Sequence, residues 1–184
     1  MRSAVLALAA IGAAVPAFAQ ETARDDAGLY LGGGPAIIFF DDSALTGDSD
    51  SHGVLGGLEL KAGWQFNRYF AVEAEYSFGI VSKSYAQGPF EVEVELDKQY
   101  GAYAVGRLPV SRVIDFYARL GISTATTTGS VGGTVIQTNE DEGAAYGAGL
   151  DFSLARDLVL RADYTAFDIE PEGSGLSFLL LKKF

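Results

Sequence analysis

Residues 175–184 read GLSFLLLKKF, and the spacing of their apolar side chains decides the fold. The residues of this stretch that fall on one face of an extended strand include Leu176, Phe178, Leu180 and Phe184. Apolar residues at every second position are typical of a β-strand with one apolar face. The same alternation returns along the chain, with turn residues between the segments and no sustained helical period. The sequence therefore predicts an all-β fold.

Eight segments carry this alternation, and we expect strands at about 28–40, 54–66, 69–80, 90–108, 113–125, 143–154, 157–167 and 175–184. The connections alternate in length. Tight turns are expected at 67–68, 109–112 and 155–157, and longer loops at 41–53, 81–89, 126–142 and 168–174. Short turns at one end and long loops at the other are typical of outer-membrane barrels. We therefore predict an eight-stranded antiparallel up-and-down transmembrane β-barrel over residues 28–184.

The chain opens with the features of an export signal. Arg2 supplies a short positive region, residues 4–15 are apolar and rich in alanine, and Ala17-Phe18-Ala19 is an A-x-A cleavage signal. We predict a signal peptide over residues 1–19, recognised at Ala17 and Ala19, and a flexible N-terminal segment over 20–27. Export followed by barrel formation predicts the bacterial cell outer membrane as the location.

Composition excludes several classes of function. The chain has 184 residues, a formal net charge of −11 and no cysteine. It therefore has no disulfide framework, cysteine metal site or thiol nucleophile. An acidic chain without basic clusters argues against nucleic acid as a partner, because phosphate contacts need lysine and arginine. We expect neither a cofactor nor a metal.

Aromatic residues on the expected apolar face gather at two levels. The level of the tight turns holds Tyr30, Trp64, Phe66, Phe70, Phe116, Phe152 and Phe184. The level of the long loops holds Phe40, Phe78, Tyr100, Tyr146, Tyr164 and Phe178. Two aromatic girdles around an apolar band indicate a barrel whose apolar face meets lipid. A soluble barrel also alternates, but it has no reason to sort its aromatic residues by height.

The polar face carries charges of both signs. Its candidate lumen residues are Glu59, Lys61, Glu73, Glu75, Arg107, Arg119, Asp151, Arg161 and Asp163. Each charge would cost a few kcal/mol if it faced the middle of the lipid, so these side chains should point inward. An eight-stranded barrel is just wide enough for its own side chains to fill. We therefore predict a network of internal ion pairs that plugs the lumen, with an ion pathway as the alternative.

The run GAGLDF at 147–152, the tight turn after it and LVLRADY at 158–164 resemble the small outer-membrane β-barrel families. These are the OmpA-like and opacity-protein-like barrels, often called "porin family". The resemblance covers essentially the whole mature chain and specifies fold more than role. It implies that the last strand is read by the barrel assembly machinery through Phe178, Leu180 and Phe184.

Enzymes exist on this fold, namely the lipid A deacylases and palmitoyltransferases, and both use a histidine with a serine. The chain has one histidine, His52, expected in the first external loop beside Ser49 and Ser51. Neighbours on a flexible loop do not hold a base and a nucleophile in fixed geometry. We therefore expect no catalysis.

The hypothesis that the sequence favours is a structural or surface-interaction protein that supports envelope integrity or adhesion. Its expected partners are outer-membrane lipid, lipopolysaccharide, the assembly machinery and an external protein bound by the loops. Residues 90–97 (FEVEVELD) continue a strand beyond the 9–11 residues that a crossing needs, so we expect them to project outside the cell. Their open edge could accept a strand from another protein, although plain structural extension is the alternative. A narrow, low-conductance channel is the second hypothesis, and a lipid A-modifying enzyme is the third.

Overall fold

The structure is a computed structural model of the chain, and it describes residues 27–41, 52–81, 83–87, 90–131, 134–169 and 173–184. The predicted signal peptide with Ala17 and Ala19, and all of segment 20–27 except Ala27, lie outside these residues. No helix in the described part is long and apolar enough to cross a membrane. The strands are β1 (Gly28–Asp41), β2 (His52–Gln65), β3 (Phe70–Val81), β4 (Lys83–Gln87), β5 (Phe90–Pro109), β6 (Ile114–Val131), β7 (Thr134–Ser153), β8 (Leu158–Asp168) and β9 (Gly173–Lys183).

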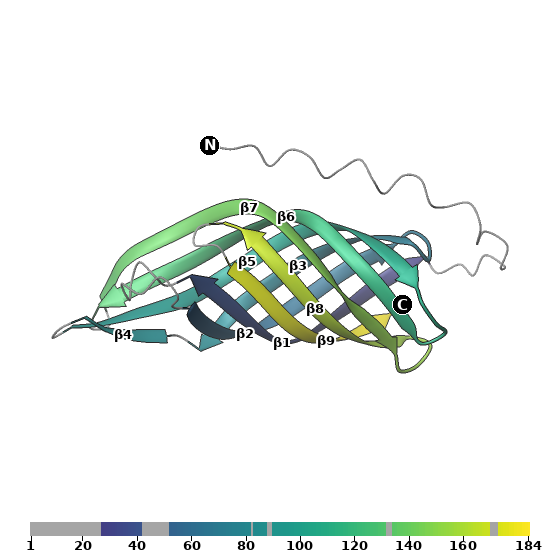
Figure 1. Cartoon of the computed structure of the whole chain (residues 1–184), viewed down its shortest axis with the longest axis horizontal. Helices are drawn as coiled ribbons and strands as arrows, with labels where there is room; N and C mark the ends of the chain where they lie inside the picture. The colour runs from purple at the N-terminus through teal and green to yellow at the C-terminus, as the bar shows by residue number, and fades with distance from the viewer. Residues whose placement is uncertain (1–26, 42–51, 82, 88–89, 132–133, 170–172) are drawn as a thin grey trace.

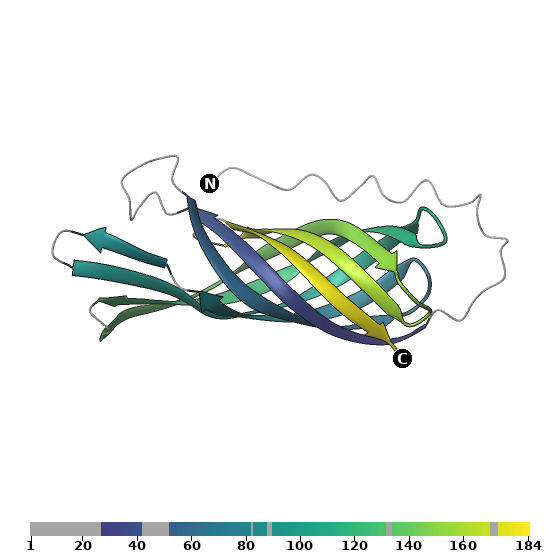
Figure 2. The same cartoon turned by 90° about the horizontal axis from the view of Figure 1, so that it is seen from below.

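The strands form one closed antiparallel sheet. Sequential neighbours pair along the chain except for β3 and β4, β1 pairs with β9, and β3 pairs with β5 to close the ring. The short β4 pairs with β5, as β3 does, but with an earlier part of that strand. β3 and β4 together therefore occupy one strand position of the barrel. Figures 1 and 2 show the strands winding obliquely around the barrel axis. The prediction of an eight-stranded antiparallel barrel is confirmed.

Side-chain caps stabilise two of the tight turns that close one end of the barrel. Asn67 Oδ1 accepts hydrogen bonds from the backbone N–H groups of Tyr69 and Phe70, at 2.8 and 3.0 Å. Ser111 Oγ accepts two equivalent bonds at 3.2 and 3.0 Å. Asparagine and serine favour such positions because a short polar side chain can replace the missing backbone partner. These caps fix the strand register at this end.

The outer surface carries the predicted aromatic girdles. Exposed aromatic side chains at the tight-turn end are Trp64, Phe66, Phe70, Phe116 and Phe184. Those toward the other end are Tyr76, Tyr100, Tyr146, Tyr164 and Phe178. On β3, the exposed apolar positions run from Phe70 to Ile80. At about 3.3 Å per residue and a tilt of about 40°, this stretch covers roughly 25 Å, which suits the apolar band of an outer-membrane barrel.

The prediction for β1 was wrong about which face points outward. Tyr30 is 1% exposed and points into the barrel. Phe40 also points inward, because a Cβ added at Gly53 would lie 2.1 Å from its ring. Phe39 takes the outward place and is exposed. Apolar residues stand on both faces of β1, so alternation alone could not assign its direction.

The outer end of the barrel also differs from the prediction. Residues 126–142 are expected as a loop, but 126–131 belong to β6 and 134–142 belong to β7, and these strands pair from Ile114–Phe152 out to Val131–Thr134. Likewise β4 lies within the loop expected at 81–89. These extensions have polar residues on both faces, so the apolar alternation that marks a strand disappears there, although their β-branched threonines favour strand. Figure 2 shows the extended strands projecting well beyond the barrel body.

Candidate functional site

All nine charged residues predicted for the lumen point into the barrel and are buried. Cross-strand pairing places opposite charges beside each other on the inner face. Lys61 on β2 stands opposite Glu75 on β3, and Arg161 on β8 stands opposite Asp151 on β7. A carboxylate and a cation directly opposite each other stabilise a strand pair, so the register itself builds the network.

The first part of the network surrounds the Arg161 guanidinium, which is fully buried. Its Nε and Nη2 atoms donate to the two carboxylate oxygens of Asp151, at 2.7 and 2.9 Å. Its Nη1 atom donates to Glu73 Oε1 at 2.5 Å, and the hydroxyl of Tyr30 donates to the same oxygen. Arg107 Nη1 lies 3.1 Å from Asp151 Oδ2. Both carboxylates therefore contact more than one donor.

The second part of the network surrounds the ammonium of Lys61. Its Nζ atom lies 2.7 Å from Asp163 Oδ2, 2.9 Å from Glu59 Oε1 and 3.3 Å from Glu75 Oε2. These three carboxylates form the one group in the described part whose oxygens, within 4.8 Å of one another, could hold a metal ion. The ammonium of Lys61 already supplies a positive charge at that point, as buried carboxylates require.

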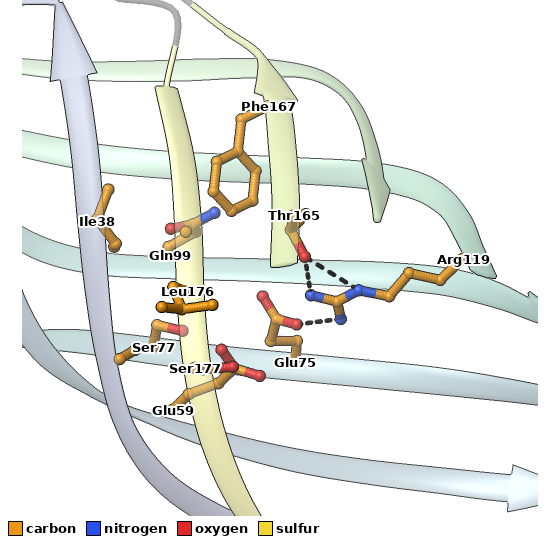
Figure 3. Close-up of a pocket in the computed structure, with 12 residues that line it drawn as sticks. Ile38, Glu59, Glu75, Ser77, Gln99, Arg119, Thr165, Phe167, Leu176 and Ser177 are labelled. Carbon is orange, nitrogen blue, oxygen red and sulfur yellow. Dashed lines mark hydrogen bonds and ion pairs between the residues drawn. The ribbon is translucent and has the colours of Figure 1, made fainter. Parts of the chain in front are cut away.

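Arg119 joins the second part to the barrel wall, as Figure 3 shows. It donates to Glu75 and to the hydroxyl of Thr165, and its Nη2 atom lies 2.9 Å from Asp163 Oδ2. Its guanidinium lies over the ring of Tyr103, 4.2 Å from the centroid. A cation that is stacked on an aromatic ring and paired with carboxylates is strongly held in a dry interior.

Glycines on the inner face make room for these long side chains. A Cβ added at Gly149 would lie 2.5 Å from the hydroxyl oxygen of Tyr117, and one at Gly147 would lie 3.1 Å from Arg119 Nε. The ring of Tyr117 in turn lies under the guanidinium of Arg161, 4.2 Å from ring centroid to Cζ. A larger residue at either glycine would displace a member of the network.

A small cavity lies beside the charged network inside the barrel. A cavity of about 10 Å³ lies beside Glu59, Glu75 and Arg119, and its further lining includes Ser77 and Gln99 (Figure 3). That volume accommodates about one water molecule. A larger opening, of about 270 Å³, lies at the tight-turn end, and its lining includes Tyr30, Gln65 and Phe184.

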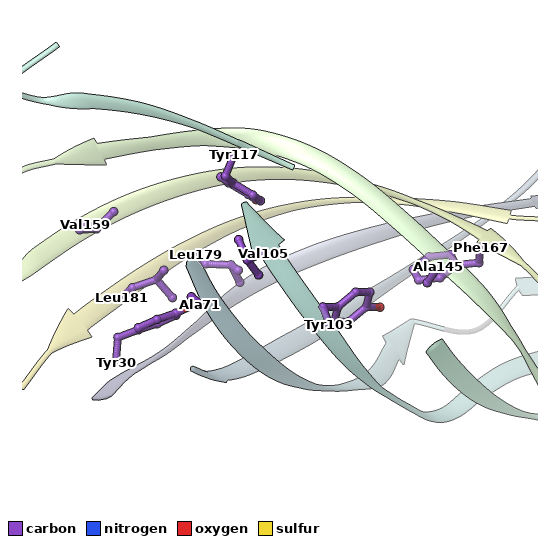
Figure 4. Packing of buried hydrophobic residues seen from close by; sticks show 10 residues of the cluster. All are labelled: Tyr30, Ala71, Tyr103, Val105, Tyr117, Ala145, Val159, Phe167, Leu179 and Leu181. Carbon is purple, nitrogen blue, oxygen red and sulfur yellow. The ribbon is translucent and has the colours of Figure 1, made fainter. Parts of the chain in front are cut away.

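Sequence reasoning missed an apolar layer inside the barrel. The buried apolar side chains that pack together include Tyr30, Ala71, Val105, Tyr117, Val159, Leu179 and Leu181 (Figure 4). Tyr30, Val159 and Leu181 lie near the strand ends at the tight turns. The run Leu179-Leu180-Leu181, apolar on both faces, was the available signal for this layer.

The remaining sequence-derived sites lie at the outer surface or at strand ends. Phe178, Leu180 and Phe184 point outward and are exposed. His52 is the first residue of β2, paired with Asp41, and not part of a loop as predicted. Ser49 and Ser51, its expected neighbours, fall outside the described residues.

Lys182 shares the outward face of β9 and reaches the turn after β7. Its ammonium donates to Asp157 Oδ2. This hydrogen bond, with the positive charge of Lys182, holds the pKa of the Asp157 carboxyl below its usual range. The pair is exposed, so it fixes local geometry at the end of the barrel more than it stabilises the fold.

Solved structures share this architecture. Neisserial surface protein A matches with a TM-score of 0.63 and 17% identity, over 89% of this chain and all of its own. The Yersinia pestis attachment invasion locus protein Ail, in complex with the heparin analogue sucrose octasulfate, matches with a TM-score of 0.61 and 17% identity, over 85% of this chain and 97% of its own. The N-terminal barrel domain of Pseudomonas aeruginosa OprF matches with a TM-score of 0.56 and 11% identity, over 85% of this chain and 98% of its own. At these identities the likeness shows the fold.

No curated protein sequence matches this chain. The family model described as "Outer membrane protein beta-barrel domain" matches residues 5–179, which is nearly the whole sequence. Its match agrees with the closed sheet, the lipid-facing aromatic girdles and the charged interior. The chain belongs to the outer membrane protein β-barrel domain family, and it is a protein of the bacterial outer membrane.

Proposed function

We propose that this protein is a surface-interaction protein: a barrel with a plugged lumen that anchors a projecting sheet outside the cell. The observation that carries the proposal is the unequal length of its strands at the outer end. β5, β6 and β7 continue past the barrel wall, whereas β8 ends at Asp168. The projecting strands would then bind the partner, and this binding would mediate adhesion or support the envelope.

The buried ion pairs inside the barrel support this proposal over a channel. Nine charged side chains fill the barrel with ion pairs, and the cavity beside Glu59 and Glu75 measures about 10 Å³. A conducting pore needs a continuous water-filled path, and rotamer changes by several buried, paired side chains would be required to open one. The plug instead makes the barrel a rigid anchor.

The projecting strands support an external role because barrel closure does not require them. Beyond the outer girdle, Val92–Leu96 of β5 pairs with Thr127–Val131 of β6, and β6 pairs with β7 up to Val131–Thr134. From Tyr100 to Phe90, ten residues at about 3.3 Å each extend roughly 33 Å along the strand. An ordered sheet of this length holds its surface away from the lipid.

The membrane partners follow from the same geometry. The exposed apolar band would contact outer-membrane lipid and lipopolysaccharide. The outward row of Phe178, Leu180 and Phe184 on β9 and beyond its end offers the assembly machinery an exposed apolar strand face. Export would use the predicted signal peptide over residues 1–19.

The proposal can be tested by shortening the projecting sheet without touching the barrel. Thr126 and Glu140 are directly paired, so residues 127–139 can be replaced by a two-residue Asn-Gly turn that keeps the register. The matched control is Gly132→Asn, which introduces the same Asn-Gly dipeptide between Val131 and Thr134 and keeps both strands at full length. Bacteria that display each variant are then measured for retention on epithelial cell layers and for cell–cell sedimentation.

We expect the shortened variant to reach the outer membrane in folded form and to lose retention, while the control keeps it. If the shortened barrel supports retention and sedimentation as well as the wild type does, the projecting sheet does not do the binding work.

A further inference from the structure

The projecting part of β7 has one open edge. Residues Ala144–Ser153 pair with β8, beginning at Ala144 opposite Asp168. Residues 134–143, apart from Ile136 at a β-bulge, pair with β6 alone among the described strands. At Gly143 the backbone of Asp168 lies so close that an added Cβ would be 1.9 Å from its carbonyl oxygen, and the pairing ends there. Along this stretch, about every second residue of β7 therefore turns its backbone N–H and C=O away from β6, toward an edge that no described strand pairs with.

The sheet has a second open edge at β4, but that edge is shorter. β4 has five residues, Lys83–Gln87, which pair with β5. The open part of β7 is twice as long, and a longer edge allows more main-chain hydrogen bonds to an added strand. β4 also begins with a lysine, whereas the open part of β7 has no basic residue. The two edges therefore differ in both length and charge.

The charge of the β7 edge selects the kind of strand that can pair with it. Glu140 and Glu142 are exposed and share one face, and Asp141 points to the other face. Their partners on β6 are Thr126, Thr124 and Ala125, all neutral. Acidic residues on an edge repel an identical strand of a second copy and repel polyanions, because like charges directly opposite are destabilising. Opposite charges at the same positions stabilise the pair.

We propose that the Thr134–Gly143 edge of β7 binds an extended basic segment of another protein by strand addition. The segment would carry lysine or arginine at two positions, one opposite Glu140 and one opposite Glu142, so that a basic–x–basic pattern matches the edge. This inference rests on the proposed surface-interaction function and names the chemistry of its partner. A sulfated polyanion, such as the one bound by Ail, has the wrong charge for this edge.

The test uses the full barrel in phosphatidylcholine nanodiscs, which add no net lipid charge. The probe is a fluorescent ten-residue peptide of alternating lysine and threonine, and its Kd is measured by fluorescence anisotropy. A second peptide has the same sequence with every other backbone amide N-methylated, which keeps the charge and removes the main-chain donors. Two barrel variants each lose one negative charge of the projecting sheet: E142Q on the β7 edge, and D97N on β5, two strands from that edge.

We expect the lysine–threonine peptide to bind and its N-methylated form to bind at least about tenfold more weakly, because strand addition depends on main-chain hydrogen bonds. E142Q should weaken binding by about two- to fivefold, the size of one cross-strand charge pair, and D97N should leave the Kd unchanged.

Two results would overturn the inference. The first is that the lysine–threonine peptide does not bind the wild type. The second is that both peptides bind equally well and that E142Q and D97N weaken binding equally, which indicates diffuse charge attraction. The outcome is separable from that of the shortened barrel. Loss of retention in the shortened variant without peptide binding rejects the basic strand alone. Peptide binding with unchanged retention rejects the proposed function alone.

Discussion

Replacing Arg161 by methionine tests whether the lumen network holds the barrel together. The substitution keeps an unbranched side chain of similar length but removes the charge and three donated hydrogen bonds, two to Asp151 and one to Glu73. A hydrogen bond to a charged group contributes about 1.5–3 kcal/mol, so three would sum to roughly 4.5–9 kcal/mol. Arg107 still faces Asp151 at 3.1 Å, and Tyr30 still donates to Glu73, so part of that loss is compensated.

The expected decrease in the free energy of unfolding is therefore about 3–5 kcal/mol, the usual cost of leaving one side of a buried ion pair without its partner. Urea titration of the refolded barrel in phospholipid vesicles measures it. Trp64 is the single tryptophan and lies on the outward face, so its emission reports the transfer of the barrel wall out of lipid. The control is Arg156→Met in an exposed turn, which should leave the midpoint unchanged.

A second variant keeps the reasoning testable if Arg161→Met folds poorly. Adding Asp151→Asn to Arg161→Met removes one of the two carboxylates that the first substitution leaves behind, so the double variant should regain part of the lost stability. A decrease below about 1 kcal/mol for Arg161→Met, with an unchanged urea dependence, would show that the network is dispensable for stability and would refute the argument.

Three further outcomes are expected. Arg119→Ala and Arg161→Ala should each raise single-channel current in planar bilayers if these side chains plug the lumen, and silent barrels from both variants would reject the plug. Gly149→Ala should lower the refolding yield, since its Cβ would lie 2.2 Å from a carbonyl oxygen of β8, whereas Gly106→Ala, with nothing within 4 Å, should refold like the wild type. Deleting Phe184 should reduce the amount of folded barrel in the outer membrane, seen as loss of the heat-modifiable gel band, and normal accumulation would exclude it from the assembly signal.

The charged interior was predictable because lipid imposes a strict rule on side chains. Residues such as Lys61 and Glu75 alternate with apolar neighbours, and a charge facing the bilayer is too costly, so period and polarity together assign their direction. Which charges pair was not predictable. The bidentate bond between Arg161 and Asp151 depends on strand register, and the contact between Arg161 and Glu73 joins β8 to β3, which are not neighbours in the sheet.

The strands that carry little contrast between their faces were the ones misjudged. β1 is apolar on both faces, so its sequence does not show which face points into the barrel. In the structure the ring of Tyr30 lies over Gly63 on β2, which places that face inside. The outer parts of β6 and β7 are polar on both faces, so their sequence resembles that of a loop, although the two strands pair with each other there. In both cases the alternation of apolar and polar residues could not assign the faces, because the two faces of the strand carry side chains of similar polarity.

The sequence alone determined the all-β class, the number of wall strands, the outward aromatic girdles and the inward charges, since each follows from a period of two set against lipid. The tertiary structure decided the partners within the network, the apolar layer of Leu179 and Leu181, and the open acidic edge of β7. Those features depend on closure and register, which bring together residues far apart in the chain. A local sequence pattern does not show that one strand ends at a point where the neighbouring strand continues.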